Sequence, residues 1–255
     1  LDSTDGADEA SGTVAIGKSA LAALTSGASN VALGYQALQQ HTTGDRNIAI
    51  GYQAMYLTDG DENDAPDSDD NIAIGYRSMG GNWRDDVKNT DNIAIGTDSL
   101  NGVLDTQVGT IAIGSDALAA LTTGGENVAI GYQALQTHTT GDRNIAIGYQ
   151  AMTNTDAGSN SLASQDNIFI GRSSGGGAWA DSNSNANIGI GTKTLEGALN
   201  DVDGSIAVGY YALNALTSGA KNTAIGYQAG LAMTDNANNV VIGYQSFIAA
   251  DAGES

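Results

Sequence analysis

The sequence predicts an all-β fold, a parallel β-solenoid or β-roll of about 13 coils. A nine-residue phrase, written N-x-A-I-G-Y-Q-A-L, recurs along the whole chain. Its central glycines lie 17 to 24 residues apart, and the series of intervals nearly repeats after every fifth unit. Such self-similarity indicates a solenoid, in which each repeat buries its apolar face only by stacking on its neighbours. The central glycines are Gly17, Gly34, Gly51, Gly75, Gly96, Gly114, Gly131, Gly148, Gly171, Gly191, Gly209, Gly226 and Gly243.

The residues before each central glycine form the predicted strand. Before Gly51, Ile48 and Ile50 alternate with Asn47 and Ala49, and a period of two is typical of a strand with one buried face. We expect the larger aliphatic residues to point inward and their copies to stack in parallel ladders. The expected inward-facing residues include Ile48, Ile50, Ile145 and Ile147.

The position four residues before the central glycine is asparagine in ten of the 13 coils. Stacked asparagine side chains form amide ladders that satisfy backbone groups at a corner. We therefore expect a structural ladder and not a ligand-binding row. The exceptions, Thr13, Thr110 and Ser205, each begin a group of five coils. The asparagines are Asn30, Asn47, Asn71, Asn92, Asn127, Asn144, Asn167, Asn187, Asn222 and Asn239.

A second glycine follows ten residues after the first in the short coils, preceded by Thr-Ser or Thr-Thr. Glycine adopts a positive φ without steric cost, so this position is predicted to be the turn that closes the coil. These glycines are Gly27, Gly44, Gly124, Gly141 and Gly219.

Alanine stands two residues before the central glycine in ten of the 13 coils, with Phe169, Gly189 and Val241 as the exceptions. If the neighbouring aliphatic residues face inward, these alanines form a flat outer strip. A strip of small residues suits a second surface that approaches closely, although crowding at a corner of the coil is an alternative reason for it. The predicted assembly face is Ala32, Ala49, Ala73, Ala94, Ala129 and Ala146.

Tyrosine and glutamine follow the central glycine in six coils. A regular row of aromatic residues is compatible with sugar stacking, but its place in the repeat favours a structural tyrosine stack. The pairs begin at Tyr35, Tyr52, Tyr132, Tyr149, Tyr227 and Tyr244.

The third and fourth coils of a group carry inserts, which are predicted to be loops at one edge, where solenoids often bind ligands. In the first insert, Asp59, Asp61 and Asn63 have the spacing that opens a calcium loop. The sixth loop position is Asp64, where glycine is expected, and no correctly placed glutamate closes the loop. A calcium site and a solvated acidic loop both remain open.

The fourth-coil inserts share a tryptophan, Trp83 in the first group and Trp179 in the second. An exposed tryptophan stacks on glycan rings or anchors a partner. The other interpretation is that each ring folds back over an open coil edge. Both residues are therefore candidate ligand or partner contacts.

Composition excludes several classes of function. The formal net charge of −20 disfavours binding to nucleic acid and to anionic membranes. Cysteine is absent, so disulfides and thiolate chemistry are excluded. No hydrophobic run is long enough for a membrane span, and no catalytic motif appears. The two histidines, His41 and His138, occupy equivalent repeat positions and are predicted to be corner residues. We therefore predict no catalytic residue and no cofactor apart from the candidate calcium ion.

The repeats resemble the head repeats of trimeric autotransporter adhesins, whose hallmark is close to N-x-V-A-I-G-x-x-A. Residues 30–34 (NVALG) and 127–131 (NVAIG) match it, and the run NTAIGYQA at 222–229 also resembles repeats of phage tail fibres and bacterial surface fibres. The resemblance covers nearly the whole chain. It implies a left-handed parallel β-roll in which three chains pack side by side.

These features predict a continuous solenoid over 12–247, with five-coil groups starting near 12, 109 and 204, and flanks at 1–11 and 248–255. The chain begins with Leu1, so we expect a processed chain or an excised fragment.

We expect a non-enzymatic fibre protein, extracellular or on a cell or virion surface, that adheres or builds a matrix. No amphipathic helix caps either end, so its partners are predicted to be copies of itself, side by side as a trimer or end to end as a filament. The alternative is a module whose insert loops bind calcium or host or matrix glycans. A solenoid polysaccharide lyase is disfavoured, because no acid/base cluster breaks the repeat.

Overall fold

The computed structural model describes residues 11–58, 68–83, 88–105, 107–155, 163–179 and 182–248. It groups the chain into two compact units, Leu1–Asn127 and Val128–Ser255. All regular secondary structure in the described residues is β, and within each unit every strand pairs in parallel with the next. The predicted all-β parallel solenoid is therefore confirmed, whereas its left-handedness and its continuity over 12–247 remain predictions.

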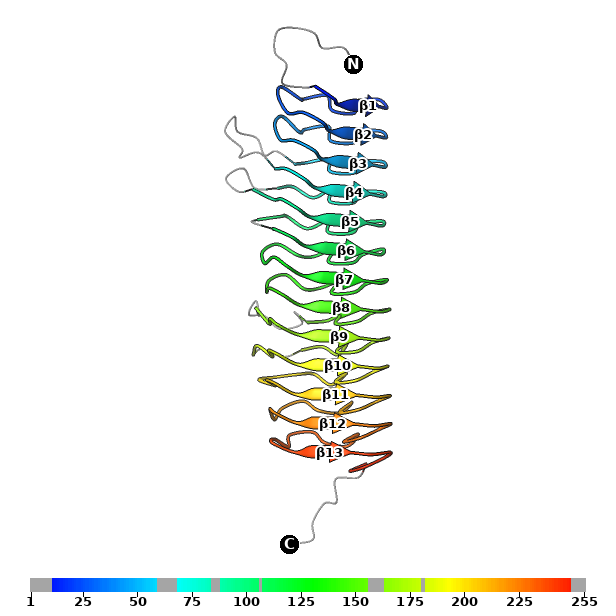
Figure 1. Cartoon of the computed structure of the whole chain (residues 1–255), viewed down its shortest axis with the longest axis vertical. Coiled ribbons are helices and arrows are strands. Elements are labelled where there is room, and N and C mark those ends of the chain that lie inside the picture. The colour runs from blue at the N-terminus through cyan, green and yellow to red at the C-terminus, as the bar shows by residue number, and fades with distance from the viewer. Residues whose placement is uncertain are drawn as a thin grey trace. The chain divides into compact units, whose positions relative to one another are not determined.

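Both units use the same three-residue strand, once per coil (Figure 1). Unit 1 contains β1 (Val14–Ile16), β2 (Val31–Leu33), β3 (Ile48–Ile50), β4 (Ile72–Ile74), β5 (Ile93–Ile95) and β6 (Ile111–Ile113). Unit 2 contains β7 (Val128–Ile130), β8 (Ile145–Ile147), β9 (Ile168–Ile170), β10 (Ile188–Ile190), β11 (Ile206–Val208), β12 (Thr223–Ile225) and β13 (Val240–Ile242). Equivalent residues pair without slip, as Ala32 does with Ala49.

Each strand ends at a glycine because the chain turns there in a conformation that side chains disfavour. Gly51 has a φ of 139°, and a Cβ at this position would collide with the carbonyl oxygen of Gly75 in the next coil. The turn continues through left-handed residues, Gln53 at φ 54° and Met55 at φ 49°. Coil-to-coil hydrogen bonds persist through the turn, for example from Gln53 N–H to the Tyr35 carbonyl at 2.9 Å. The second glycines also have positive φ, as predicted, with Gly44 at 106°.

The asparagine ladder is confirmed in both units. In unit 1, Asn47 donates its backbone N–H to Asn30 Oδ1 at 2.9 Å, and its side-chain amide to the Ser68 carbonyl at 2.8 Å. In unit 2, Asn187 N–H donates to Asn167 Oδ1 at 2.9 Å. Each amide thus binds the coil before it and the coil after it, which satisfies buried corner groups that would be costly to leave unpaired.

The side of the strand that faces the core was predicted wrongly. Ala49 is fully buried, whereas Ile48 and Ile50 on either side of it are partly exposed. The opposite side of the coil already places large side chains such as Met55 inside, so the narrow interior leaves room only for a methyl group from the strand. Ile145 and Ile147 are likewise partly exposed in β8. The predicted outer strip is therefore core: Ala32, Ala49, Ala73, Ala94, Ala129 and Ala146 all have zero exposure.

One coil departs from the alanine rule. Phe169 in β9 is fully buried at the alanine position, and its ring meets Trp179 edge to face with centroids 5.8 Å apart. Space for the ring comes from Gly175 in the same coil and Gly189 in the next, because a Cβ at either glycine would collide with Phe169. Neighbouring coils therefore adjust their side-chain sizes together.

Candidate functional site: the apolar strand face

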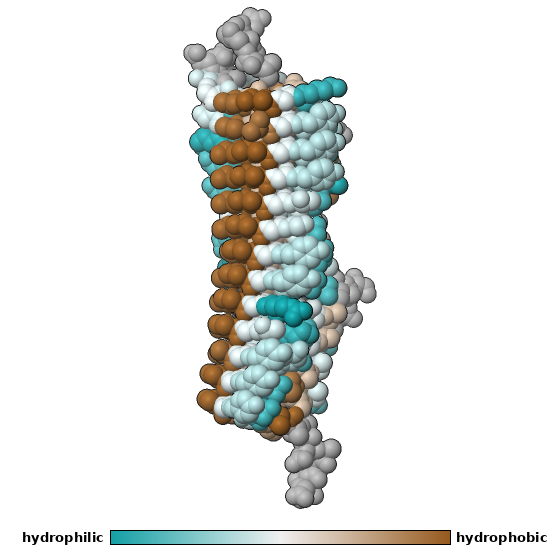
Figure 2. Space-filling model, turned by 90° about the vertical axis from the view of Figure 1, so that its right-hand side faces the viewer, coloured by the Kyte–Doolittle hydropathy of each residue, from teal (hydrophilic) through white to brown (hydrophobic). Residues whose placement is uncertain are grey.

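The first and third residues of the strands form what we call the apolar strand face. Because the middle residue of each strand points inward, both flanking aliphatic residues point outward. Ile16 is 58% exposed and Leu33 is 42% exposed in unit 1, and Ile190 is 41% exposed in unit 2. Figure 2 shows part of this face as a brown band of apolar side chains that runs through every coil of each unit. Water-exposed aliphatic rows of this regularity are unusual for a solitary soluble domain, which makes this face the candidate interaction surface.

A tyrosine column runs beside the apolar strand face, one position past the central glycines. Tyr35, Tyr52 and Tyr76 stack with ring centroids 5.2 Å apart at each step, and Tyr227 continues the same pattern onto Tyr244 at 5.3 Å. The structural stack is thus confirmed. Since the rings cover one another's faces, they offer mainly edges to solvent, which leaves little area for sugar stacking.

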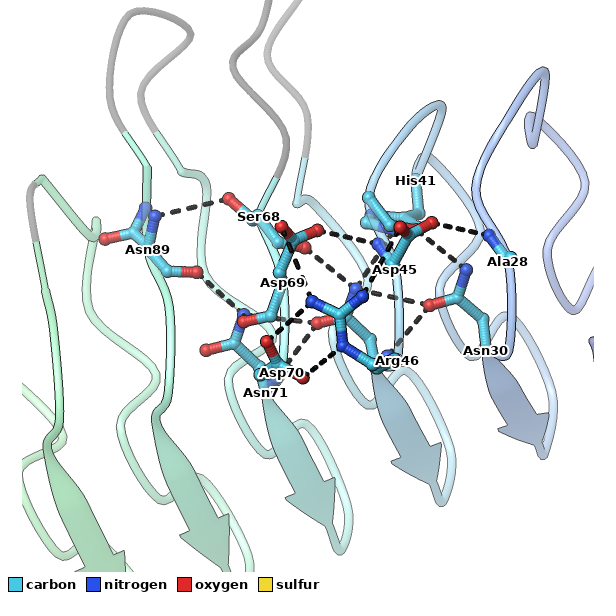
Figure 3. A network of polar contacts seen from close by, with 12 residues as sticks. Ala28, Asn30, His41, Asp45, Arg46, Ser68, Asp69, Asp70, Asn71 and Asn89 are labelled. Carbon is cyan, nitrogen blue, oxygen red and sulfur yellow. Dashed lines mark hydrogen bonds and ion pairs between the residues drawn. The ribbon is translucent and has the colours of Figure 1, made fainter. Parts of the chain in front are cut away.

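The polar corner lies before the strands, at the end of the first insert (Figure 3). Arg46 Nε donates to Asp70 Oδ1 at 2.6 Å, and Arg46 Nη2 donates to Asp70 Oδ2 at 2.8 Å. Asp45 Oδ1 accepts the Ala28 N–H, and Asp69 Oδ1 accepts the Asp45 N–H. This network joins three successive coils at the point where the chain returns from the insert to the solenoid.

The hydrogen bonds at the polar corner also shift the pKa of carboxyl groups. The bond from the Arg46 guanidinium lowers the pKa of Asp70 below its ordinary value. In unit 2, Arg143 Nε donates to Asp166 Oδ1 at 2.7 Å and lowers the pKa of that carboxyl in the same way. These side chains are 41–52% exposed, so water and salt screen the pairs and their contribution to stability is small.

Both histidines lie inside the coil, at equivalent positions. His41 is fully buried, with Nδ1 3.1 Å from Thr58 Oγ1, and His138 Nδ1 is 3.0 Å from Thr155 Oγ1. Thr58 and Thr155 are also buried. A buried His–Thr pair gives a substrate no access, so the arrangement links coils and does not form a nucleophile–base site.

The tryptophans are not available to a ligand. Trp83 and Trp179 are each 1% exposed, so their prediction as ligand or partner contacts is wrong. Trp179 Nε1 donates to the Gly175 carbonyl at 3.0 Å, and the Trp83 backbone N–H donates to the Leu57 carbonyl at 3.0 Å. The rings fold inward because burial of so large an apolar surface stabilises the edge of the coil.

The candidate calcium ligands Asp59, Asp61 and Asn63 lie outside the described residues. Within the described residues, no group of three or more His, Asp or Glu side chains could hold a metal ion. In that same part of the chain, no helix has the length and hydropathy needed to cross a bilayer.

Sequence reasoning missed the apolar strand face, although a signal for it was present. A wide core requires large inward residues, but this chain has few aromatics and places alanine at the centre of nearly every strand. Alanine between two isoleucines therefore indicates a thin coil with the alanine inside. Comparison with known proteins adds no assignment, since no protein-family model, curated protein or solved structure matches the chain.

Proposed function

We propose that this chain is a non-enzymatic structural module of an extracellular or surface fibre, and that it assembles with copies of itself through the apolar strand face. The exposed Val and Ile rows are the observation that carries the proposal. Contact of such rows with water is unfavourable, and covering them with another apolar surface lowers the free energy. A second copy is a suitable cover, because its rows repeat at the same coil spacing of about 4.8 Å.

The resemblance to adhesin heads and tail fibres supports a closed assembly of three chains. In a closed assembly every copy uses the same surface, so the aliphatic rows of all copies are covered together. Ladders of hydrogen bonds between coils make each unit stiff, which suits a fibre that adheres or builds a matrix. The fully buried His–Thr pairs and tryptophans support a structural role over a catalytic or glycan-binding one.

The proposal is tested by the oligomeric state in solution. We expect sedimentation of the full chain to give a discrete oligomer, with three copies as the expected number. Changing Leu33, Ile74 and Ile95 together to Thr keeps β-propensity but removes apolar area from three exposed positions in one row of unit 1. This variant is expected to dissociate to monomer at concentrations where the parent stays assembled.

Val103 and Val108 supply the matched control. They are 49% and 46% exposed but lie outside the strands. Changing both to Thr is expected to leave the oligomer intact. A parent chain that sediments as a monomer at all concentrations and salt levels would refute the proposal.

A further inference from the structure

Three residues of unit 2 depart from the repeat and lie together. Lys193 stands two positions after its central glycine, where six coils have glutamine, and Glu196 stands five positions after the same glycine. No other coil has a lysine at the first of these positions or a carboxylate at the second. In the next coil, Asn214 occupies the position that corresponds to Glu196, and the two side chains are in contact.

The Glu196 carboxylate holds an amine and an amide at once. Lys193 Nζ lies 2.9 Å from Glu196 Oε1, and Asn214 Nδ2 donates to Glu196 Oε2 at 3.0 Å. A second bond, from Asn214 Nδ2 to the Lys193 carbonyl oxygen at 3.0 Å, ties the amide to the backbone of the lysine. The ammonium and the carboxamide are therefore held on neighbouring coils around a single group that can carry a proton.

These side chains are partly withdrawn from water. The side chains of Lys193 and Glu196 are 28% and 26% exposed, and Asn214 is half-buried. Lys193 Nζ lies 5.6 Å from the centroid of the Tyr211 ring. That ring is in turn packed against Tyr210, with centroids 4.4 Å apart. The tyrosine covers one side of the ammonium, which keeps the lysine close to the carboxylate.

The equivalent place in unit 1 has neither the amine nor the facing amide. There the residues are Asp98 and Asn101 in one coil and Ala119 in the next. Asn101 Nδ2 donates to Asp98 Oδ1 at 3.2 Å, and the Leu100 N–H still bonds to the Ala117 carbonyl of the next coil at 2.9 Å. The coils therefore stack without a lysine, a glutamate and an amide at these positions, so the group in unit 2 has a role other than folding.

We propose that Lys193 and Asn214 form an intramolecular isopeptide bond, with Glu196 as the proton carrier. Glu196 takes a proton from the ammonium, and the resulting amine attacks Cγ of Asn214. The new bond joins Nζ to Cγ, the bond between Cγ and Nδ2 breaks, and Nδ2 leaves as ammonia. Of the three ammonium protons, one stays on the new amide, one leaves with the ammonia and one passes to water, the last two through Glu196.

The geometry offsets the low reactivity of the two groups. The hydrogen bond that Lys193 donates to Glu196 raises the pKa of the ammonium, so little free amine is present near neutral pH and the proton has to move within the pair. Holding amine and amide together replaces a bimolecular encounter, which gives a large gain in rate. The product joins positions 21 residues apart on adjacent coils and restricts the unfolded chain. Because it forms within one chain, it does not depend on self-assembly.

Mass spectrometry of the purified full chain tests the bond. After prolonged incubation at neutral pH, we expect the parent chain to be lighter than its sequence by the mass of one ammonia. Trypsin does not cleave after an acylated lysine, so residues 173–221 should appear as one peptide that is lighter by the same mass. Without the bond, trypsin divides this stretch after Lys193.

Two substitutions within the group test the roles of its members. Lys193→Arg keeps a cation beside Glu196, but a guanidinium stays protonated and does not attack, so we expect no loss of ammonia. Glu196→Gln keeps the shape of the side chain but cannot carry the proton. We expect the cross-link to form at least about tenfold more slowly in this variant.

Matched controls are Lys221→Arg, at another lysine of unit 2, and Asn101→Ala, at the equivalent place in unit 1. Both are expected to lose ammonia as the parent does, and a circular dichroism spectrum like that of the parent shows that Lys193→Arg is folded. Ammonia loss that persists in Lys193→Arg would come from a cyclic imide of asparagine and would overturn the proposal. A parent chain that keeps its full sequence mass, or an unchanged rate in Glu196→Gln, would overturn it too.

Discussion

Single side chains decide how thin this solenoid is. The strand contributes one methyl group per coil to the interior, as Ala49 does, while the turn contributes larger groups such as Met55. Ile48 and Ile50 are left on the surface because the same interior cannot hold both. Protein interiors are close-packed, so a residue too large for this position has nowhere to move.

Ala49→Leu is expected to destabilise the fold by about 1–3 kcal/mol, because the added carbons overpack a filled interior. Ile50→Ala removes a side chain that is already partly exposed, and we expect a cost of about 1 kcal/mol or less. Urea denaturation at low protein concentration measures both without the effect of assembly. A larger cost for Ile50→Ala than for Ala49→Leu would contradict this account of the core.

Neighbouring residues of a coil share one interior volume, so their sizes vary together. The fourth coil of the first group has Ala73 and Met79, whereas the fourth coil of the second group has Phe169 and Gly175 at the same positions. Ala73, Met79 and Phe169 are fully buried. Gly175 has no side chain and leaves the space that the Phe169 ring fills. The two coils are alternative solutions to the same packing problem.

The exchange is tested by giving the second of these coils the residue types of the first, through Phe169→Ala and Gly175→Met. Phe169→Ala alone is expected to cost about 3–5 kcal/mol through the cavity it leaves, and Gly175→Met alone is expected to be destabilising because its side chain meets the Phe169 ring. Met79 already adopts the required positive φ, at 50°. The double variant should therefore cost at least about 1 kcal/mol less than the sum of the two single changes.

Chemical denaturation of the four proteins in this cycle gives the coupling. Ala73→Phe in unit 1 is the control, since Met79 remains in place there and no space exists for the ring. It is expected to be destabilising without a compensating partner. Additive costs for Phe169→Ala and Gly175→Met would show that the two positions do not share a volume.

Charge acts on the molecule as a whole and would oppose the proposed assembly. Copies that each carry a formal charge of −20 repel one another, while the apolar strand face favours association. Self-repulsion is screened by salt, whereas hydrophobic burial is not weakened by it. If the chains assemble as proposed, we therefore expect ionic strength and protonation of the carboxylates to set the balance between assembled and separate chains.

Association is expected to strengthen as salt is added, and also as the pH falls from 7 towards about 4, where ordinary carboxylates begin to protonate. The carboxyl groups of Asp70 and Asp166, each hydrogen-bonded to an arginine, have pKa values below the ordinary one. Their small stabilisation is present above the unfolded pKa and is lost only as the pH falls through the lower folded value, so these two pairs should still be formed near pH 4. Sedimentation across a salt and pH series measures the association, and weaker association in either series would contradict the prediction.

Much of the architecture was determined by the sequence alone, because a repeat fixes whatever every coil must do in common. The 13 central glycines predicted the coils, the asparagines predicted a ladder that Asn47 and Asn187 now make, and the tyrosines predicted a stack. These inferences succeeded because identical residues in successive parallel coils must lie beside one another.

Only the tertiary structure decided which side of each strand faces the core. A period of two defines two faces, but the choice between Ala49 and its isoleucine neighbours depends on the volume that residues elsewhere in the coil leave free. The inward fold of Trp83 and Trp179 was decided in the same way, by the space at the coil edge. The scarcity of aromatic residues points to a thin coil, but the period of two alone does not give that volume, and only the closed coil shows which strand residues it leaves outside.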